Sequence, residues 1–166
     1  PATAGIVTTN ETICEGSCTD IEFELEGDAP YTINYTENGV PATPIVTSDP
    51  NYTLTVCPTA TTTYVLTGVS DVNCTGFANG SVTVTIDELN DAGSDVLLTY
   101  CADGSVINLV PELSGDAMTG GTFDQATLIA DEANAGNYTY TVDLNTCPAD
   151  AATYNVSFDP QIEVTG

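Results

Sequence analysis

Residues 19–27, TDIEFELEG, alternate apolar and acidic side chains without a break. Ile21, Phe23 and Leu25 fall on one face of the segment, and four acidic side chains fall on the other: Asp20, Glu22, Glu24 and Glu26. A period of two is typical of a β-strand that places one face on a core and the other in water. The segment therefore predicts a half-buried antiparallel strand, and a helix could not use this pattern.

The same pattern recurs along the chain. Residues 31–39, YTINYTENG, end in the hairpin signal Asn38-Gly39. The segments NYTLTV, TTTYVLTGV and SVTVTIDE follow, and their predicted inward residues include Tyr52, Leu54, Val56, Val82, Val84 and Ile86. After the polar stretch DELNDAGSD a second set begins with VLLTYC, SVINLVPEL, TYTVDL and TYNVSF. We therefore predict an all-β chain of two tandem antiparallel β-sandwiches, residues 1–88 and a smaller one at residues 89–166.

The charged residues of the chain are all acidic. It contains 24 Asp and Glu but no Lys, Arg or His, which gives a formal net charge of -24. Such a chain is repelled by DNA, RNA and anionic membranes. Nucleophilic triads, Schiff bases and phosphate clamps also need His, Lys or Arg. No apolar run reaches the ~20 residues of a membrane span. We predict a protein that is not an enzyme, requires no cofactor, and does not insert directly into a membrane.

The six cysteines favour disulfides in an oxidising compartment. Cys18 shares the parity of the glutamates of residues 19–27, and Cys57 has the opposite parity to Leu54 and Val56. The pattern thus predicts a Cys18–Cys57 staple on the outside of the first domain. Cys14–Cys74 would then close a long loop in the first domain and Cys101–Cys147 would staple the second, although the sequence leaves other connectivities open.

Three long segments carry a family resemblance. They are TICEGSCTDIEFELEGDAPYTINYTENG, YTLTVCPTATTTYVLTGVSDVNCTGFANGSVTVTID and GGTFDQATLIADEANAGNYTYTVDLNTCPADAATYNVSF. They resemble the PKD-like or Ig-like repeats of large surface and secreted proteins of Bacteroidetes, including adhesins and gliding-associated proteins exported by type IX secretion. Two departures stand out: Cys18 and Cys57 look like an added pair, and Phe123 stands where the companion repeat often has Trp. The resemblance implies Ig-like/PKD-like sandwiches on the cell surface.

Two groups of polar residues suggest binding or modification. Four carboxylates near the domain boundary have the density of a calcium site: Asp87, Glu88, Asp91 and Asp95. A solvated polar linker is the interpretation that we favour for them. Sequons for N-glycosylation begin at Asn10, Asn34, Asn51, Asn79, Asn137 and Asn155. A further sequon at Asn73 abuts a cysteine that we expect to be bonded.

Several functions remain compatible with these features. We expect a structural or adhesive segment of an extracellular array or fibre, whose partners are neighbouring domains or copies of itself. One alternative is a filament subunit in which ATAGIVTTNETI or QIEVTG adds a strand to the next copy. Another is a module that binds a surface glycan or protein through its loops. A glycosidase pair among Glu22, Glu24 and Glu26 is disfavoured, because side chains on one strand face point outward in parallel instead of converging across a cleft.

Overall fold

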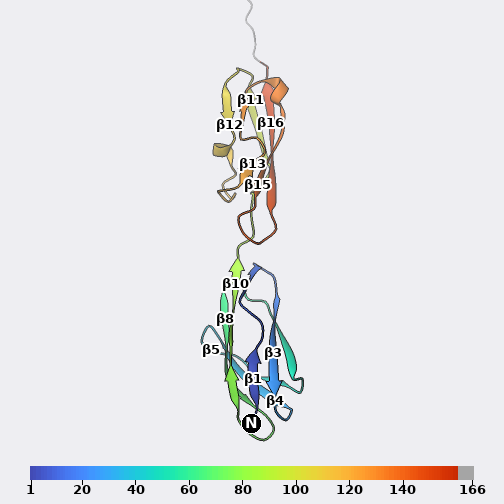
Figure 1. Cartoon of the computed structure of the whole chain (residues 1–166). Helices are drawn as coiled ribbons and strands as arrows, with labels where there is room; N and C mark the ends of the chain where they lie inside the picture. The colour runs from blue at the N-terminus through green and yellow to red at the C-terminus, as the bar shows by residue number, and fades with distance from the viewer. Residues whose placement is uncertain (161–166) are drawn as a thin grey trace, which may run out of the picture. The chain divides into compact units, whose positions relative to one another are not determined.

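The regular secondary structure of residues 1–160 is almost entirely β-strand (Figure 1). The computed structural model describes residues 1–160, and its contacts divide the chain into two compact units, Pro1–Glu88 and Leu89–Gly166. Within residues 1–160 the helical elements are two short 3-10 turns, η1 (Val110–Glu112) and η2 (Glu132–Asn134). The all-β prediction is confirmed.

The first unit is a sandwich of two sheets. One sheet has the order β7-β3-β1-β9, made of Asn51–Val56, Thr19–Glu26, Thr3–Ile6 and Phe77–Asn79. The other has the order β2-β10-β8-β4-β5, made of Glu11–Cys14, Ser81–Asp87, Thr62–Ser70, Tyr31–Glu37 and Val40–Pro41. A short strand, β6 (Ile45–Thr47), also pairs with β4.

The alternation of residues 19–27 places the core of the first unit as predicted. Ile21, Phe23 and Leu25 on β3 are buried, while the acidic side chains between them are exposed. Facing them from the second sheet are Ile33, Tyr64, Leu66, Val69, Val82 and Val84. The predicted hairpin is also present: Glu37 pairs with Val40, and Asn38 and Gly39 adopt φ values of 49° and 82°. Both values lie in the left-handed region that an Asn-Gly turn accommodates.

Parallel pairing at the ends of the first unit departs from the prediction of an antiparallel sandwich. The N-terminal segment is split into β1, which lies between β3 and β9, and β2, which pairs in parallel with β10. The first segment thus contributes a strand to each sheet. Alternation within a strand reveals which face is buried but not the direction of its neighbour, so the sequence could not show this pairing.

The second unit has a four-stranded sheet with the order β11-β16-β15-β13 and a two-stranded sheet of β12 and β14. The strands are β11 (Val96–Cys101), β12 (Val106–Asn108), β13 (Thr122–Phe123), β14 (Thr127–Ile129), β15 (Gly136–Val142) and β16 (Asp150–Asp159). Here too the first and last strands, β11 and β16, pair in parallel. The segment SVINLVPEL leaves its strand after Asn108, because Pro111 lies in η1 and cannot donate to a ladder.

Carboxylates in turns accept hydrogen bonds from the backbone. In several turns an Asp Oδ1 accepts the N–H two residues ahead at 2.8–2.9 Å; the residues are Asp49, Asp71, Asp91, Asp103 and Asp131. This Asx geometry stabilises a turn without any cation. It explains how a chain that cannot form side-chain salt bridges still uses its acidic residues structurally.

Candidate functional site

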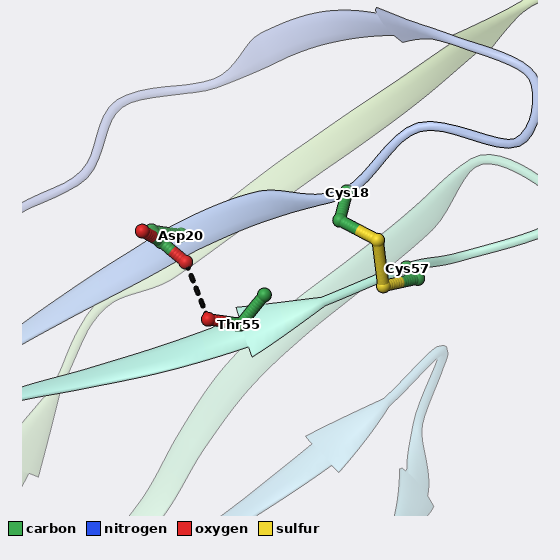
Figure 2. Close-up of a disulfide and its surroundings, with 4 residues drawn as sticks. All are labelled: Cys18, Asp20, Thr55 and Cys57. Carbon is green, nitrogen blue, oxygen red and sulfur yellow. Dashed lines mark hydrogen bonds between the residues drawn. A yellow bond between two sulfur atoms is a disulfide. The ribbon is translucent and has the colours of Figure 1, made fainter.

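The first unit contains a disulfide between Cys18 and Cys57 (Figure 2). Thr19 lies opposite Val56 in the β3–β7 ladder, so the two cysteines occupy the next opposed position, with Cα atoms 4.1 Å apart. Both cysteines are exposed. Beside them Thr55 Oγ1 donates to Asp20 Oδ1 at 2.6 Å. The bond staples the outer face of the sheet at the end of the ladder.

The expected Cys14–Cys74 pair is wrong, since Cys74 carries a free, exposed thiol. The parallel β2–β10 pairing places Cys14 beside Asp87, at the end of β10. Cys74 instead follows β8 and lies next to Thr75, which bridges to Ser70. The path along β10 and then β8 separates the two positions by roughly 35 Å at about 3.3 Å per residue. A disulfide needs Cα atoms within about 7 Å.

The expected Cys101–Cys147 pair is wrong for the same reason. Cys101 is a free, exposed thiol at the end of β11, where it lies opposite Asp159. Cys147 is buried and precedes Asp150, the first residue of β16. The length of β16 therefore separates the two cysteines by about 30 Å. Cysteine parity could not reveal this separation, because it depends on the parallel direction of β11 and β16.

Removing the Cys18–Cys57 bond should destabilise the first unit. The bond closes a loop with a sequence separation of 39, so the double variant Cys18→Ser/Cys57→Ser should lose about 4 kcal/mol of unfolding free energy. Cys74→Ser and Cys101→Ser are matched controls and should change stability by less than ~0.5 kcal/mol, because each removes an exposed free thiol. Urea titration of the full chain measures the differences. Equal losses of unfolding free energy in the double variant and in the two controls would contradict the assignment of the Cys18–Cys57 disulfide.

A hollow of about 470 Å³ lies beside the disulfide. Its lining includes Cys57, Pro58, Tyr35, Tyr64 and the Glu37 carboxylate. Burial, followed by the nearby Glu37, raises the pKa of both phenols above the usual value. The phenols therefore stay protonated at neutral pH and can donate hydrogen bonds. One lining carboxylate does not supply the two converging carboxyls that glycoside hydrolysis uses.

The three glutamates of β3 do not converge either. Glu22, Glu24 and Glu26 are exposed on one face of the strand, and Glu22 and Glu24 lie opposite Thr53 and Asn51 of β7. Their side chains face solvent in parallel, which is the arrangement of a solvated sheet face. Nothing in this geometry indicates catalysis.

The carboxylates proposed for calcium are distributed over both units. Asp91 Oδ1 accepts the N–H of Gly93 at 2.8 Å, and Asp95 Oδ1 accepts that of Thr153 at 2.7 Å. Asp87 ends β10, and Glu88 follows it. In residues 1–160 no three Asp, Glu or Cys side chains gather in a group that could hold a metal ion. Calcium binding by these four residues stays a prediction.

A calcium site would respond differently to two divalent ions. With a site, millimolar calcium should raise the melting temperature of the full chain by several degrees, and magnesium at equal ionic strength should raise it less, since Mg²⁺ retains its water shell. Equal shifts would mean that both ions merely screen the acidic surface. Differential scanning calorimetry with and without each ion distinguishes the two results.

All six predicted glycosylation asparagines are exposed: Asn10, Asn34, Asn51, Asn79, Asn137 and Asn155. Asn137 and Asn155 are cross-strand partners, and Asn155 Nδ2 donates to Asn137 Oδ1 at 2.7 Å. Asn73 is exposed as well, and its neighbour Cys74 is not in a disulfide. Exposure makes these amides accessible, and glycosylation itself stays a prediction.

An apolar pocket in the second unit escaped the sequence analysis. It has a volume of about 360 Å³, and its lining includes Val110, Leu113, Phe123, Ala126 and Tyr140. No charged side chain lines it. Phe123 packs against Tyr140 and Tyr154 with ring centroids 5.0 Å apart in each case. The pocket depends on η1 lying near the edge strand β13, which no local pattern predicts.

Two segments were predicted to add a strand to the next copy, and the structure describes only the first of them. The first, residues 2–13, is already paired within its own unit through β1 and β2, so its expected role as a free donor strand is wrong. The second, QIEVTG, lies outside the described residues. Within residues 1–160 no helix has the length and apolar character that crossing a membrane requires.

Comparisons with known proteins agree with this architecture. The family model for the Nucleoporin POM152, Ig-like domain, matches residues 7–82. Among solved structures, the I-band fragment I67-I69 from titin is 12% identical with a TM-score of 0.52, and the match covers 95% of this chain and 66% of that fragment. Sidekick-1 immunoglobulin domains 1-5 are 11% identical with a TM-score of 0.42, covering 93% of this chain and 38% of theirs.

A third solved structure, titin domains z1z2 in complex with telethonin, is 12% identical with a TM-score of 0.41, covering 96% of this chain and 98% of that one. No curated protein matches. The chain spans less than two thirds of the length of the titin I-band and Sidekick-1 structures. At these identities the likeness to the titin I-band fragment shows the fold alone. The chain has an Ig-like β-sandwich fold, and residues 7–82 are similar to the Ig-like domain of Nucleoporin POM152.

Proposed function

We propose that the chain is a load-bearing structural or adhesive segment of an extracellular bacterial surface protein, formed by two tandem Ig-like domains. Ig-like folds typically serve as structural or binding modules. The Cys18–Cys57 bond supports an oxidising location, because disulfides persist there and are rare in the cytosol. The resemblance to surface repeats of Bacteroidetes supports the bacterial cell surface.

The parallel pairing of terminal strands carries this proposal. In the first unit β2 lies near the start of the chain and pairs in parallel with β10, from which the chain leaves. In the second unit β11 and β16 are paired in the same way. Tension on the two ends of such a unit pulls parallel neighbours in opposite directions along their length. The hydrogen bonds of the ladder then bear the load together instead of opening one at a time.

Single-molecule pulling on the ends of the full chain tests this role. Each unit should unfold in a separate event, at a force comparable with that of a reference Ig-like domain in the same tether. Thr12→Pro interrupts β2 opposite Thr85 and should lower one unfolding force. Thr59→Pro is the matched control, since Thr59 is exposed in a loop outside the ladders. Unfolding of both units at low force, or equal effects of the two variants, would exclude a load-bearing role.

The apolar pocket of the second unit favours a second function, namely a module that binds a protein or glycan. Phe123 is partly exposed and offers aromatic surface in a pocket lined without charge, on a chain whose charged side chains are all carboxylates. Aromatic surface of this kind binds apolar side chains and sugar faces. A glycan array probed with the wild-type chain and Val110→Asp would show binding that the variant loses. Equal binding signals from the wild type and Val110→Asp would exclude this pocket as a glycan-binding site.

A further inference from the structure

The two free thiols of residues 1–160 lie at corresponding places in their units. In the first unit the chain leaves through Asp87, the last residue of β10. Ser81, at the other end of β10, pairs with Val65 of β8, and β8 continues from there to Ser70, away from Asp87. Cys74 follows in the next turn. It therefore lies at the end of the first unit that is remote from the exit of the chain.

In the second unit, the segment through which the chain enters is hydrogen-bonded to the first residue of β16. Ala92 N–H donates to Asp150 Oδ2 at 2.8 Å. Cys101 lies at the opposite end, where it pairs in register with Asp159. Each unit therefore presents one exposed, free thiol at the end that faces away from the junction of the two units in sequence.

Exposed apolar side chains accompany each thiol. Near Cys74, Val72 exposes 63% and Phe77 68% of their surface. In the second unit the turn after Cys101 is tied to Ala130 by two backbone hydrogen bonds, and the cross-strand pair Val106–Ile129 begins beside it. Val106 exposes 71% of its surface. Exposed apolar side chains beside both thiols, on so acidic a surface, favour a contact with another molecule.

The two ends present different surfaces. Val106 and Ile129 line a hollow of about 210 Å³ together with Leu128 and the polar residues Gln125, Thr127 and Asn134. Phe77 is 68% exposed at the start of β9, at the end that carries Cys74. An exposed aromatic ring on one end and a partly apolar hollow on the other favour a contact between unlike ends of two copies.

We propose that successive copies of this chain, as separate molecules or as repeats of one array, are joined end to end by a disulfide between Cys74 of one copy and Cys101 of the next. Phe77 of the first copy packs on the hollow formed by Val106 and Ile129 of the second. The proposal deepens the proposed function and rests on its oxidising surroundings. Such a contact between unlike ends continues from copy to copy and produces a filament.

The chemistry of the joint is thiol–disulfide exchange. The two thiols lose two protons and two electrons to form one S–S bond, and a low-molecular-weight or protein disulfide takes them up and leaves as two thiols. A Cys74–Cys101 bond within one chain would use up both thiols, and the test below distinguishes it from a joint between copies.

Carboxylates beside both thiols make the joint sensitive to salt. Backbone N–H groups of Cys74 and Asn73 lower the pKa of Asp71, and the hydroxyl and N–H of Ser105 lower the pKa of Asp103. Both carboxyls are therefore ionised at neutral pH, and each lies within three residues of a thiol, so they repel each other as the two ends approach. Formation of the joint should accelerate as salt screens them.

Mixing two single-cysteine variants of the full chain tests the joint. Cys74→Ser and Cys101→Ser are each incubated with oxidised glutathione at about 0.5 M salt, which reduces the Debye length to a few Å. Each variant alone should remain monomeric on a non-reducing gel. Their equimolar mixture should give a covalent dimer, and mass spectrometry should locate its bond between Cys101 of one copy and Cys74 of the other. The wild type should form a ladder of oligomers.

A second pair of variants tests the packing. Phe77→Ser, added to the variant that retains Cys74, should slow dimer formation several-fold. Val40→Ser is the matched control, because Val40 is 66% exposed in the same unit but lies in the β4–β5 hairpin. Equal rates for the two variants would overturn the packing of Phe77 on the hollow.

Three outcomes would overturn the joint itself: dimers of either single variant that form as fast as the mixture, a Cys74–Cys101 bond within a monomer, or no cross-link at any salt concentration. The state of Cys18–Cys57 in the same digest separates this failure from a failure of the proposed function. If that bond is intact and no joint forms, only the joint is excluded. If that bond is reduced under the same conditions, the oxidising setting of the proposed function fails too.

Discussion

Tyr154→Ala should destabilise the second unit by about 4 kcal/mol. Tyr154 is fully buried on β16, and its ring packs edge-on against Phe123. Truncation leaves a cavity between η1, β13 and β15 that the short strands cannot close. The phenol oxygen also accepts the N–H of Ser114 at 3.1 Å, so the variant loses a buried hydrogen bond. Hydrogen exchange of peptides from residues 89–160 measures the loss in the intact chain.

The matched control is Tyr154→Phe. It keeps the ring and its contact with Phe123 but removes the acceptor for Ser114 N–H, so it should cost only about 1 kcal/mol. A loss for Tyr154→Phe as large as that for Tyr154→Ala would show that the hydrogen bond, and not the packing of the ring, dominates. Unchanged exchange in the first unit would confirm that the two units unfold separately.

Asn90→Ala should cost the second unit about 3 kcal/mol. Asn90 is a buried polar side chain, only 6% exposed, and its amide is fully used. Nδ2 donates to the carbonyls of Cys147 and Pro148 at 3.0 and 3.1 Å, and Oδ1 accepts the N–H of Leu144 at 3.0 Å. Alanine would remove three hydrogen bonds from a partly buried loop, and each such bond contributes about 0.5–1.5 kcal/mol of net stability.

Asn155→Ala is the control for this position. Asn155 also donates a side-chain hydrogen bond, but it is exposed on β16 and water replaces its partner. Its substitution should change the unfolding free energy by less than ~0.5 kcal/mol. Hydrogen exchange of peptides that cover residues 143–149 should accelerate in Asn90→Ala and not in Asn155→Ala. Similar exchange in both variants would show that Asn90 does not hold this loop.

The local sequence pattern predicted most strands of the first unit, because the alternation within each strand indicates which of its faces is buried. The alternation around Ile21 and Phe23, and the Asn38-Gly39 turn, need no information from distant residues. The Cys18–Cys57 bond follows the same logic, since parity and the antiparallel register of β3 and β7 suffice to oppose the two positions.

What the sequence did not show depends on pairing between distant segments. The parallel direction of β2 against β10 determines that Cys14 lies far from Cys74, and no property of either strand alone encodes that direction. Asn90 is a further example. It looks like one more polar residue of a turn-rich stretch, and its role appears only when residues 144–148 close over it. The apolar pocket around Phe123 likewise requires three separate segments to meet.

The Asx turns make net charge and architecture largely independent in this protein. In turns such as those of Asp49, Asp103 and Asp131 the acidic side chain serves the backbone as a neutral acceptor would. An Asn oxygen can accept the same N–H, and Asn tolerates the same turn conformations. Substitution from Asp to Asn at these turns could therefore change the charge of the surface step by step while the strands keep their register. Evolution can tune how strongly neighbouring molecules repel one another in a given salinity without redesigning the scaffold.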